Sequence, residues 1–383
     1  MHDTPLAPAS SPNSVTLLVP GDLNLRTGGY GYDREIVAGL RALGWQVEVL
    51  LLDETFPSPT PEARAHAVRA LAALPDGRLV LADGLAFGAM PEEAEAEAHR
   101  LNLVGLVHHP LADETGLDAT AAQRLMASER RALAATRGVV VTSQATAERL
   151  AAFAVEAGRI AVVAPGTAPA PLARGTRGFD AATTTGAAGH AGSRPPVELL
   201  CVATLVPRKG HDVLFAALAR LRHLQWHLTC AGSDRLSPST ASALRERLSA
   251  SGLTERVTLA GDLDAAALAD AYDRADLFVL ATRHEGYGMA VAEAVARGLP
   301  VVSTYTGAIP ELVGRDSGVL LQHDHIVGWT YNLGLLLSPD WDLRERLAEG
   351  ARRRRDQLPR WPDSARAMAD ALTRFAGHGI LQR

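Results

Sequence analysis

The sequence predicts an α/β protein made of two doubly wound domains, and three observations support this. Short, nearly continuous apolar runs alternate with segments of helical periodicity, which is typical of parallel sheets covered by helices on both faces. The alternation stops in a stretch rich in Gly, Ala, Thr and Pro and then begins again. The 383 residues are also more than one ordinary domain needs.

The first domain is predicted to cover residues 14–168, after a disordered tail at 1–13. Its first helix is expected in YDREIVAGLRALG (32–44), where apolar residues recur at helical spacing and Gly44 is a typical C-terminal stop. The expected strands are VTLLVP (15–20), VEVLLLD (47–53), RLVLADG (78–84), LVGLVHH (103–109), GVVVTS (138–143) and IAVVAPG (160–166).

Residues 169–196 have few large apolar side chains, which predicts a flexible linker. The second domain follows at 197–358, and residues 359–383 contain an amphipathic helix whose apolar side is expected to dock. The strands expected in the second domain are VELLCVAT (197–204), WHLTCAG (226–232), VTLAG (257–261), LFVLAT (277–282) and PVVSTY (300–305).

The composition narrows the class of protein. A formal net charge of −5 argues against a nucleic-acid-binding protein. No apolar run is long enough to span a membrane, and the first residues do not resemble a secretory signal, so we expect a cytoplasmic protein. Cys201 and Cys230 lack metal-ligand spacing, which favours buried thiols in a reducing compartment.

In open α/β sheets ligands bind at the carboxyl ends of the strands, so function is sought in the strand-to-helix loops. The first of these, DLNLRTGGYGYD (22–33), contains Gly28 and Gly29, which allow a phosphate or sugar to approach the backbone closely. Asp53 ends the next expected strand, where a nicotinamide-binding domain has an acid. A glycine-rich turn without a ligand is the alternative.

Two histidines, His108 and His109, end an expected buried strand. Because side chains alternate along a strand, one ring is expected to face the site and the other to pack. His109 lies further out and is our choice, although the sequence leaves His108 open.

The loop VPRKG holds Arg208 and Lys209, the only lysine of the chain. Two cations in a strand-to-helix loop suit a diphosphate, since arginine provides a planar fork and lysine a compact charge. Taken alone, a solvated basic turn explains the same residues.

The stretch EGYGMAVAEA (285–294) carries the strongest pattern. Glu293 lies on an expected helix that is apolar nearly all round, so its carboxylate needs partners, and a vicinal diol such as a ribose would supply them. The start of this helix, at Gly288, Met289 and Ala290, offers free backbone N–H groups to a phosphate. Glu285 and Gly286 form the preceding loop, and we expect Glu285 to be within reach of a sugar hydroxyl.

EGYGMAVAEA resembles the E-x7-E motif of the family 4 retaining glycosyltransferases, which have the GT-B fold, two Rossmann-like domains facing across a cleft. VPRKG resembles their R-x4-K loop in compressed form, and GLPVVSTYTGAIPELV (298–313) is also similar. The resemblance implies that Glu293 holds the donor ribose and Glu285 the transferred sugar. It also implies that Arg208, Lys209, the 288–290 helix start and the Gly28–Gly29 backbone stabilise the diphosphate, that His109 contacts the sugar, and that the last helix crosses back to the first domain.

The resemblance implies no metal and no cofactor beyond a UDP- or GDP-sugar, with an acceptor that the sequence does not identify. Asp262 and Asp264 form a D-x-D pattern, but a helix N-cap explains it. The run ARRRRDQ (351–357) gives a weak indication of membrane contact and is more typical of a solvated helix face. A nicotinamide-dependent oxidoreductase and a non-catalytic sugar-nucleotide-binding protein remain alternatives, and the oligomeric state stays open.

Overall fold

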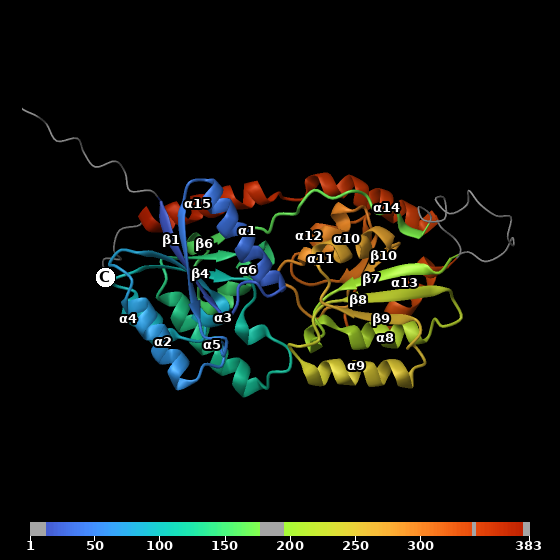
Figure 1. Cartoon of the computed structure of the whole chain (residues 1–383), viewed down its shortest axis with the longest axis horizontal. Coiled ribbons are helices and arrows are strands. Elements are labelled where there is room, and N and C mark those ends of the chain that lie inside the picture. Colours follow the sequence, from blue (N-terminus) through green and yellow to red (C-terminus); the bar gives the residue numbers. More distant parts are fainter. Residues whose placement is uncertain (1–12, 177–194, 339–341, 378–383) are drawn as a thin grey trace, which may run out of the picture. The chain divides into compact units, whose positions relative to one another are not determined.

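The computed structural model describes residues 13–176, 195–338 and 342–377 (Figure 1). It divides into two compact units, and each is described by itself. Unit 1 comprises the chain up to Pro165 together with the segment from Trp361 onward, and unit 2 comprises Gly166–Arg360. Apart from Asn13, the predicted tail lies outside the described residues, as do residues 177–194 of the predicted linker.

Unit 1 contains a six-stranded parallel sheet in the order β2-β1-β3-β4-β5-β6. Every residue of β3 and β5 is buried, which explains why these strands are apolar without alternation. The strand order reverses between β1 and β3, so the loops that follow these two strands are neighbours. The strands are β1 (Ser14–Pro20), β2 (Gln46–Leu52), β3 (Leu79–Asp83), β4 (Asn102–Val107), β5 (Gly138–Val141) and β6 (Ile160–Val162).

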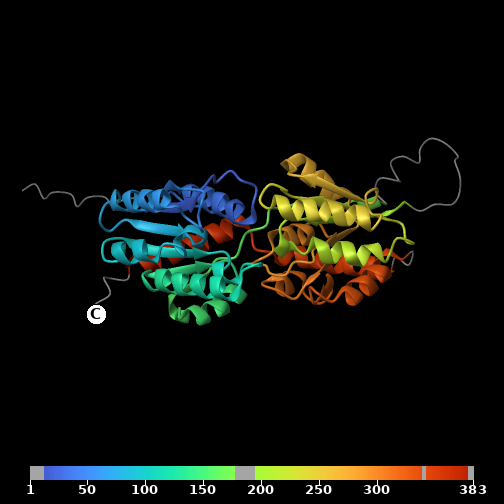
Figure 2. The same ribbon diagram turned by 90° about the horizontal axis from the view of Figure 1, so that it is seen from below.

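Helices cover both faces of this sheet (Figure 2). The first helix begins at Gly28, earlier than predicted, because Thr27 caps it by accepting a hydrogen bond from the Tyr30 amide. Gly28 and Gly29 therefore lie in the first turn of a helix and not in a loop before it. The helices are α1 (Gly28–Ala42), α2 (Pro61–Ala72), α3 (Gly84–Phe87), α4 (Pro91–Glu97), α5 (Ala119–Ala134) and α6 (Gln144–Arg149), with a 3₁₀ turn, η1, at Leu111–Asp113.

The last helix, α15 (Trp361–Gly377), belongs to unit 1, which confirms the predicted return of the chain. It packs closely on α1, since a Cβ added at Gly39 would lie 2.5 Å from the Cβ of Ala365. A Cβ at Gly138 would lie 2.2 Å from the Phe375 ring. Small residues at both positions thus allow α15 to dock.

Unit 2 contains a second six-stranded parallel sheet, in the order β12-β11-β10-β7-β8-β9. Its strand order reverses between β7 and β10. Strand β12 was not predicted, because it is a four-residue edge strand whose side chains are all only partly buried. The strands are β7 (Val197–Val202), β8 (Trp226–Ala231), β9 (Val257–Gly261), β10 (Leu277–Val279), β11 (Val301–Thr304) and β12 (Gly318–Leu321).

The two doubly wound sheets confirm the predicted fold class. In unit 2 the helices are α8 (His211–Ala219), α9 (Pro238–Ala250), α10 (Ala265–Arg274), α11 (Met289–Ala296), α12 (Ile309–Val313), α13 (Ile326–Leu337) and α14 (Asp342–Arg354).

The described start of the predicted linker is bonded to unit 2. The amide of Ala173 donates to the carbonyl of Arg297 at 2.9 Å, and the amide of Thr176 donates to the Asp276 carboxylate at 3.0 Å. These bonds give the backbone of residues 173–176 fixed partners, which the sequence composition did not indicate.

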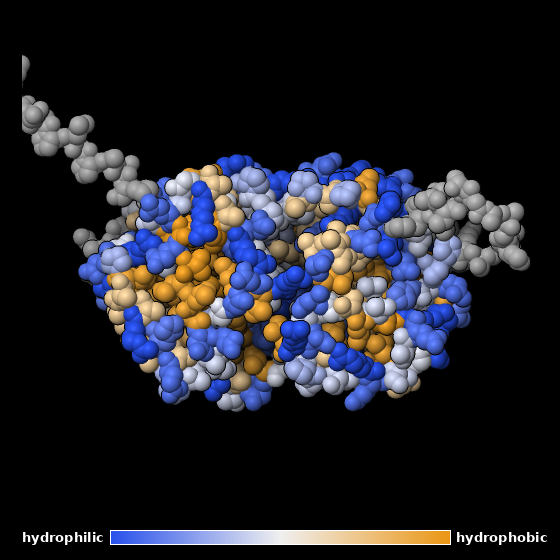
Figure 3. All heavy atoms as spheres, in the orientation of Figure 1, coloured by the Kyte–Doolittle hydropathy of each residue, from blue (hydrophilic) through white to orange (hydrophobic). Residues whose placement is uncertain are grey.

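The surface mixes hydrophobic and hydrophilic residues on the face seen in Figure 3. Three exposed apolar side chains, Val327, Tyr331 and Leu335, are spaced four residues apart and share one side of α13. Within the described ranges, no helix is long and apolar enough to cross a membrane.

The arginines of the run 352–355 make contacts inside unit 2. Arg352 pairs with Glu345 at 2.9 Å and Arg353 with Asp316 at 2.7 Å. The guanidinium of Arg355 donates to the carbonyl of Ala170 at 2.6 Å. These three arginines therefore have partners within unit 2.

Candidate functional site

The strongest cluster in unit 2 joins the two loops at the point where the strand order reverses. Lys209 follows β7 and Glu285 follows β10, and the Lys209 ammonium donates to Oε1 of Glu285. The side chains are 16% and 11% exposed, so the pair is largely, but not completely, shielded from water. A lysine ammonium has three N–H groups, so two remain for a ligand.

Two glycines allow these loops to approach each other. Gly210 has φ +67°, and a Cβ there would lie 1.8 Å from the carbonyl oxygen of Ala281. Gly307 has φ +53°, and a Cβ there would lie 1.8 Å from the carbonyl oxygen of Glu285. Any other residue at either position would be strained and would push the loops apart.

Arg208 is bound into the same pair of loops. Its guanidinium donates to the carbonyl of His284 at 2.9 Å, and its own carbonyl accepts from the Arg283 amide at 2.7 Å. An R-x4-K pattern ending at Lys209 would begin at position 204, which is Thr204. The adjacent Arg208 is therefore the cation that this chain places beside Lys209.

Burial and charge set the protonation of the ion pair. Burial alone raises the pKa of Glu285, but the charges of Lys209 and Arg208 outweigh it and hold this pKa below its usual value. Burial lowers the pKa of Lys209, and Arg208 adds to this, while Glu285 opposes it. The Glu285 carboxylate is thus held in its ionised form. Its partner Lys209 lies next to a second cation, Arg208.

Glu293 lies one helix further on, in α11. Its Oε2 accepts a hydrogen bond from the Tyr272 hydroxyl at 2.9 Å, and the Arg297 guanidinium lies 4.3 Å from the centre of the Tyr272 ring. Burial raises the pKa of Glu293, although the Tyr272 hydrogen bond and Arg297 act in the opposite direction. The sequence predicted that this buried carboxylate needs hydrogen-bond donors, and Tyr272 is one of them.

The start of α11 has the predicted form. Gly288 is the N-cap and makes no side-chain cap bond, so it leaves the amides of the first turn, which begins at Met289 and Ala290, without a capping side chain. Gly286 lies in the preceding loop, where its carbonyl oxygen would be 3.1 Å from a Cβ at Gly307. The backbone N–H groups needed for an anion are therefore present.

Unit 1 brings Gly29 and one histidine together, whereas nothing lies within 4 Å of a Cβ at Gly28. A Cβ at Gly29 would lie 3.5 Å from Cδ2 of His108. Nε2 of His108 lies 3.1 Å from Oδ1 of Asp33 and 3.4 Å from Oδ2 of Asp83. His109 lies beside Glu114, with 3.8 Å between its Nε2 and Oε2 of that carboxylate.

Other residues singled out in the sequence have structural partners. Asp53 accepts hydrogen bonds from both the amide and the hydroxyl of Thr55, at 2.9 and 2.6 Å. Asp264 caps α10 by accepting from the Ala267 amide at 2.8 Å, as predicted. Asp53 is thus engaged in a local turn.

Tertiary structure also creates two groups that the spacing did not reveal. Strand register places Cys201 opposite Cys230, and Sγ of Cys201 lies 3.7 Å from Nε2 of His211. The side-chain atoms through which Cys201, Cys230 and His211 could bind a metal lie within 4.8 Å of one another. The same holds for the group Asp33, Asp83 and His108. Sequence distance hid both groups, because their members come from different strands and helices.

Comparison with known proteins places this site in context. Residues 196–338 match the family model described as "Glycosyl transferases group 1". This range contains Arg208, Lys209, Glu285 and Glu293, whereas the glycines and histidines of unit 1 lie outside it.

Two curated relatives are similar over part of the chain. A D-inositol 3-phosphate glycosyltransferase from Xylanimonas cellulosilytica is 30% identical over 251 residues, which are 63% of this chain and 58% of that protein. A mannosylfructose-phosphate synthase from Agrobacterium fabrum is 36% identical over 117 residues, 29% of this chain and 26% of that protein. The chain thus spans little more than half of the first relative's length and about a quarter of the second's.

Solved structures are similar over nearly the whole chain. Sucrose-phosphate synthase from Thermosynechococcus elongatus has a TM-score of 0.77 at 21% identity, covering 94% of this chain and 98% of that one. HepE from Anabaena, solved with UDP and glucose, has a TM-score of 0.72 at 17% identity, covering 93% and 99%. Unit 2 is similar to glycosyltransferases in sequence, and the chain has the fold of these GT-B proteins.

Proposed function

We propose that the chain is a retaining, metal-independent glycosyltransferase that moves a sugar from a UDP- or GDP-sugar to an acceptor. The observation that carries this proposal is the Lys209–Glu285 ion pair at the strand reversal of unit 2, with Glu293 on the helix that follows. The match of this region to the group 1 glycosyltransferases supports it. A cytoplasmic location is part of the same proposal.

Each residue has a role in breaking the bond between the anomeric carbon and the donor diphosphate. The electron pair of that bond leaves with the diphosphate, whose growing charge Arg208 and Lys209 stabilise. The backbone N–H groups at Gly288, Met289 and Ala290 add to this. Donors placed in advance stabilise such charge without reorganisation, typically by about 10²–10³ in rate for each donor.

The two glutamates hold the rest of the donor. Glu285 uses lone pairs not occupied by Lys209 to accept hydrogen bonds from the transferred sugar, with Gly286 giving the loop room. Glu293 accepts from the ribose hydroxyls. Because Glu285 contacts Lys209, the group that holds the sugar also orients the group that holds the phosphate.

In unit 1, the backbone of Gly28 and Gly29, at the start of α1, helps to stabilise the diphosphate. A histidine after β4 contacts the sugar, His109 by the sequence prediction. The two curated relatives are named as a D-inositol 3-phosphate glycosyltransferase and a mannosylfructose-phosphate synthase, while the acceptor of this chain is left open in the proposal.

Thermal-shift measurements with UDP, GDP and NAD test the function. We expect UDP or GDP to raise the melting temperature and NAD to have no effect, because Asp53 is engaged by Thr55. Stabilisation by NAD alone would favour the oxidoreductase.

Release of UDP or GDP from a panel of nucleotide sugars, measured with and without EDTA, separates an enzyme from a binding protein. Release that persists in EDTA supports metal-independent transfer. Binding without release would favour the non-catalytic alternative.

A further inference from the structure

Two cysteines face each other on neighbouring strands of unit 2. Cys201 lies in β7 and Cys230 in β8, and the parallel register of the two strands pairs these residues directly. Because residues paired in register point to the same face of a sheet, the two thiols lie on one side. Both residues are 1% exposed, and neither forms a disulfide. Register therefore brings together two buried sulfur atoms that are far apart in the sequence.

A histidine from the helix after β7 completes the group. His211 is the first residue of α8 and is 2% exposed. Its Nε2 lies 3.7 Å from Sγ of Cys201, and one donor atom from each of the three residues lies within 4.8 Å of the other two. Gly210, with φ +67°, turns the chain from Lys209 into this helix. The group thus joins two strands and the start of the helix that follows Lys209.

The spacing of these atoms suits one tetrahedral zinc ion. Zinc binds a thiolate sulfur at about 2.3 Å and an imidazole nitrogen at about 2.0 Å. At tetrahedral angles, a sulfur and a nitrogen on the same ion are then about 3.5 Å apart, and two sulfurs about 3.8 Å apart. The 3.7 Å between Sγ of Cys201 and Nε2 of His211 is close to the first value. Side-chain shifts of no more than about 1 Å bring the whole group to these distances.

The partners that these side chains have are weak. A cysteine sulfur is a weak hydrogen-bond donor and acceptor, so its contact with Nε2 of His211 contributes little. Among the described residues, Nδ1 of His211 is buried and has no hydrogen-bond partner. A buried polar atom of this kind is costly and calls for a physical explanation, of which a bound ion is one. A metal–nitrogen bond gives the imidazole the strong partner that the neighbouring sulfur does not.

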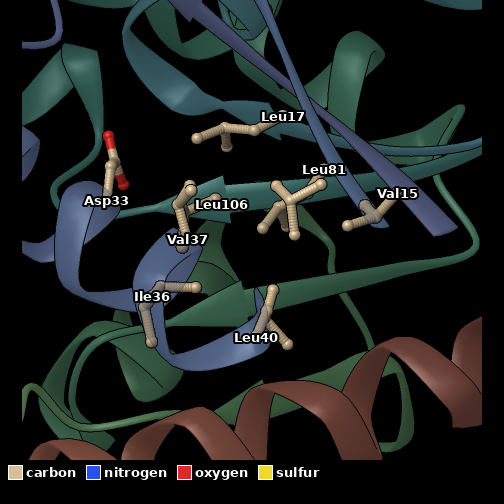
Figure 4. Close-up of a pocket in the computed structure, with 9 residues that line it drawn as sticks. Val15, Leu17, Asp33, Ile36, Val37, Leu40, Leu81 and Leu106 are labelled. Atoms are coloured by element: carbon tan, nitrogen blue, oxygen red, sulfur yellow. The ribbon is translucent and has the colours of Figure 1, made fainter. Parts of the chain in front are cut away.

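The second group of potential ligands, in unit 1, does not share this property. Nε2 of His108 lies 3.1 Å from the Asp33 carboxylate and 3.4 Å from that of Asp83, so charged side chains already serve as its partners. Figure 4 shows Asp33 next to the apolar residues Val37 and Leu106, at a cavity of about 10 Å³, roughly the volume that one water needs. The lining of this cavity offers no metal ligand besides Asp33. The cysteine group is therefore the stronger candidate.

Charge and ligand type select the ion. Each thiol releases its proton to solvent when its sulfur binds the metal, so two thiolates balance the 2+ charge of zinc, and the histidine binds as neutral imidazole. An assembly without net charge can be buried at far lower cost than an unpaired ion. Thiolate and imidazole ligands favour zinc over magnesium, calcium or manganese, which prefer oxygen. The described residues supply three ligands, which leaves the fourth tetrahedral position to a water.

We propose that Cys201, His211 and Cys230 form a structural zinc site in unit 2. The ion ties β7, β8 and the first turn of α8 together, and so fixes the ends of the segment that carries Lys209. It takes no step in the proposed glycosyl transfer, whose chemistry stays metal-independent, and the inference does not rest on that function. Because its ligands are buried, the ion is bound as unit 2 folds.

Zinc retention after refolding tests the site. The full chain is unfolded in urea with a phosphine reductant, freed of metal, refolded with zinc and passed over a chelating resin before metal analysis. We expect wild-type protein to retain about one zinc ion per chain and Cys201→Ala or Cys230→Ala less than about a tenth of that, because each variant loses a ligand. Wild type without retained zinc, or equal retention in the alanine variants, would overturn the site.

Two histidines provide a matched pair of variants for the same measurement. His227 also belongs to unit 2, in β8, but its ring contacts Glu198 and Thr258. We expect His227→Gln to retain zinc like the wild type and His211→Gln to lose most of it. Equal retention by these two variants would contradict the proposed ligand set.

Cobalt(II) provides a check on the wild-type chain that needs no variant to fold. Thiolate ligands give cobalt an intense near-ultraviolet charge-transfer absorption, and tetrahedral coordination strengthens its visible bands. We expect both features after refolding with cobalt under reducing conditions, and we expect zinc present during refolding to abolish them. A spectrum with only the weak visible bands of octahedral cobalt would count against the site.

Thermal stability gives an independent readout. A ligand that binds only the folded chain raises its melting temperature, so zinc-refolded wild type should melt several degrees above the metal-free protein. Cys230→Ala should show no such shift, and an equal shift in both proteins would contradict the site. None of these measurements uses a nucleotide sugar, so failure of the zinc site leaves the proposed glycosyl transfer intact.

Discussion

The ammonium of Lys209 is ion-paired with the carboxylate of Glu285, although 76 residues separate them in the sequence. From the sequence alone, Lys209→Ala is expected to leave folding intact. The buried pair changes this expectation, because removing one partner leaves the other charge without its counterion.

We therefore expect Lys209→Met and Glu285→Gln each to lower the free energy of unfolding by about 1–3 kcal/mol. The double variant should lose less than the sum, since the two residues are in contact. Urea unfolding measures all three, and strictly additive losses would contradict the coupling. Arg245→Met is the matched control, because its pair with Asp234 is 52% and 38% exposed, so water screens it and its loss should change stability little.

Glu285 also predicts the response of stability to acid. Its folded-state pKa lies below its usual value, so its contribution is fully present above about pH 4.5. That contribution is lost as the pH falls through the folded-state pKa. We expect Glu285→Gln to flatten this part of the stability curve, measured by urea unfolding between pH 3 and 6. An unchanged slope would mean that Lys209 does not stabilise the ionised carboxylate.

Glu293 and Tyr272 predict a graded effect on donor binding. Glu293→Gln should raise the donor KM about 10- to 100-fold with little change in kcat, as expected for loss of a hydrogen bond to a charged group. Tyr272→Phe keeps the ring that stacks on Phe278 at 6.2 Å and removes the hydroxyl. Because this hydroxyl lowers the pKa of Glu293, its loss should weaken donor binding more at pH 5 than at pH 8. A pH-independent KM in Tyr272→Phe would count against this role.

The docking of α15 gives a prediction for unit 1. Gly138→Ala should lower the free energy of unfolding by about 1–3 kcal/mol, because its Cβ would lie 2.2 Å from the Phe375 ring. Gly158→Ala is the control, since nothing lies within 4 Å of a Cβ there. Adding Phe375→Leu to Gly138→Ala should recover part of the loss. Equal stability of the two alanine variants would contradict this prediction, because it would mean that α15 shifts to make room for the methyl group without loss of unfolding free energy.

Much of the fold was predictable because apolar runs are strong local signals. Eleven strands were expected close to their observed positions, and β12 was missed because its four residues are partly exposed at a sheet edge. The start of α1 was misplaced, since two glycines suggest a loop while Thr27 caps a helix. In the candidate site, the sequence pointed to Glu293 through a charge in an apolar helix, which burial makes costly. It pointed to Lys209 as the only lysine, in a strand-to-helix loop, and to Glu285 as a loop residue before that helix.

Tyr272, Asp33 and Asp83 were missed because nothing near them in the sequence marks them. Tyr272 lies within a helix of ordinary composition, and Asp83 ends a strand like many others. Only packing brings Tyr272 to Glu293 and the two aspartates to His108.

By itself the sequence determined two parallel sheets, the loops that carry charge and the resemblance to a glycosyltransferase, since periodicity and composition are local properties. The tertiary structure decided which residues touch. Strand order makes β7 and β10 neighbours, so Lys209 meets Glu285, and it sets β3 beside β4, so Asp83 meets His108. Such contacts depend on crossovers between distant segments, which no local pattern specifies.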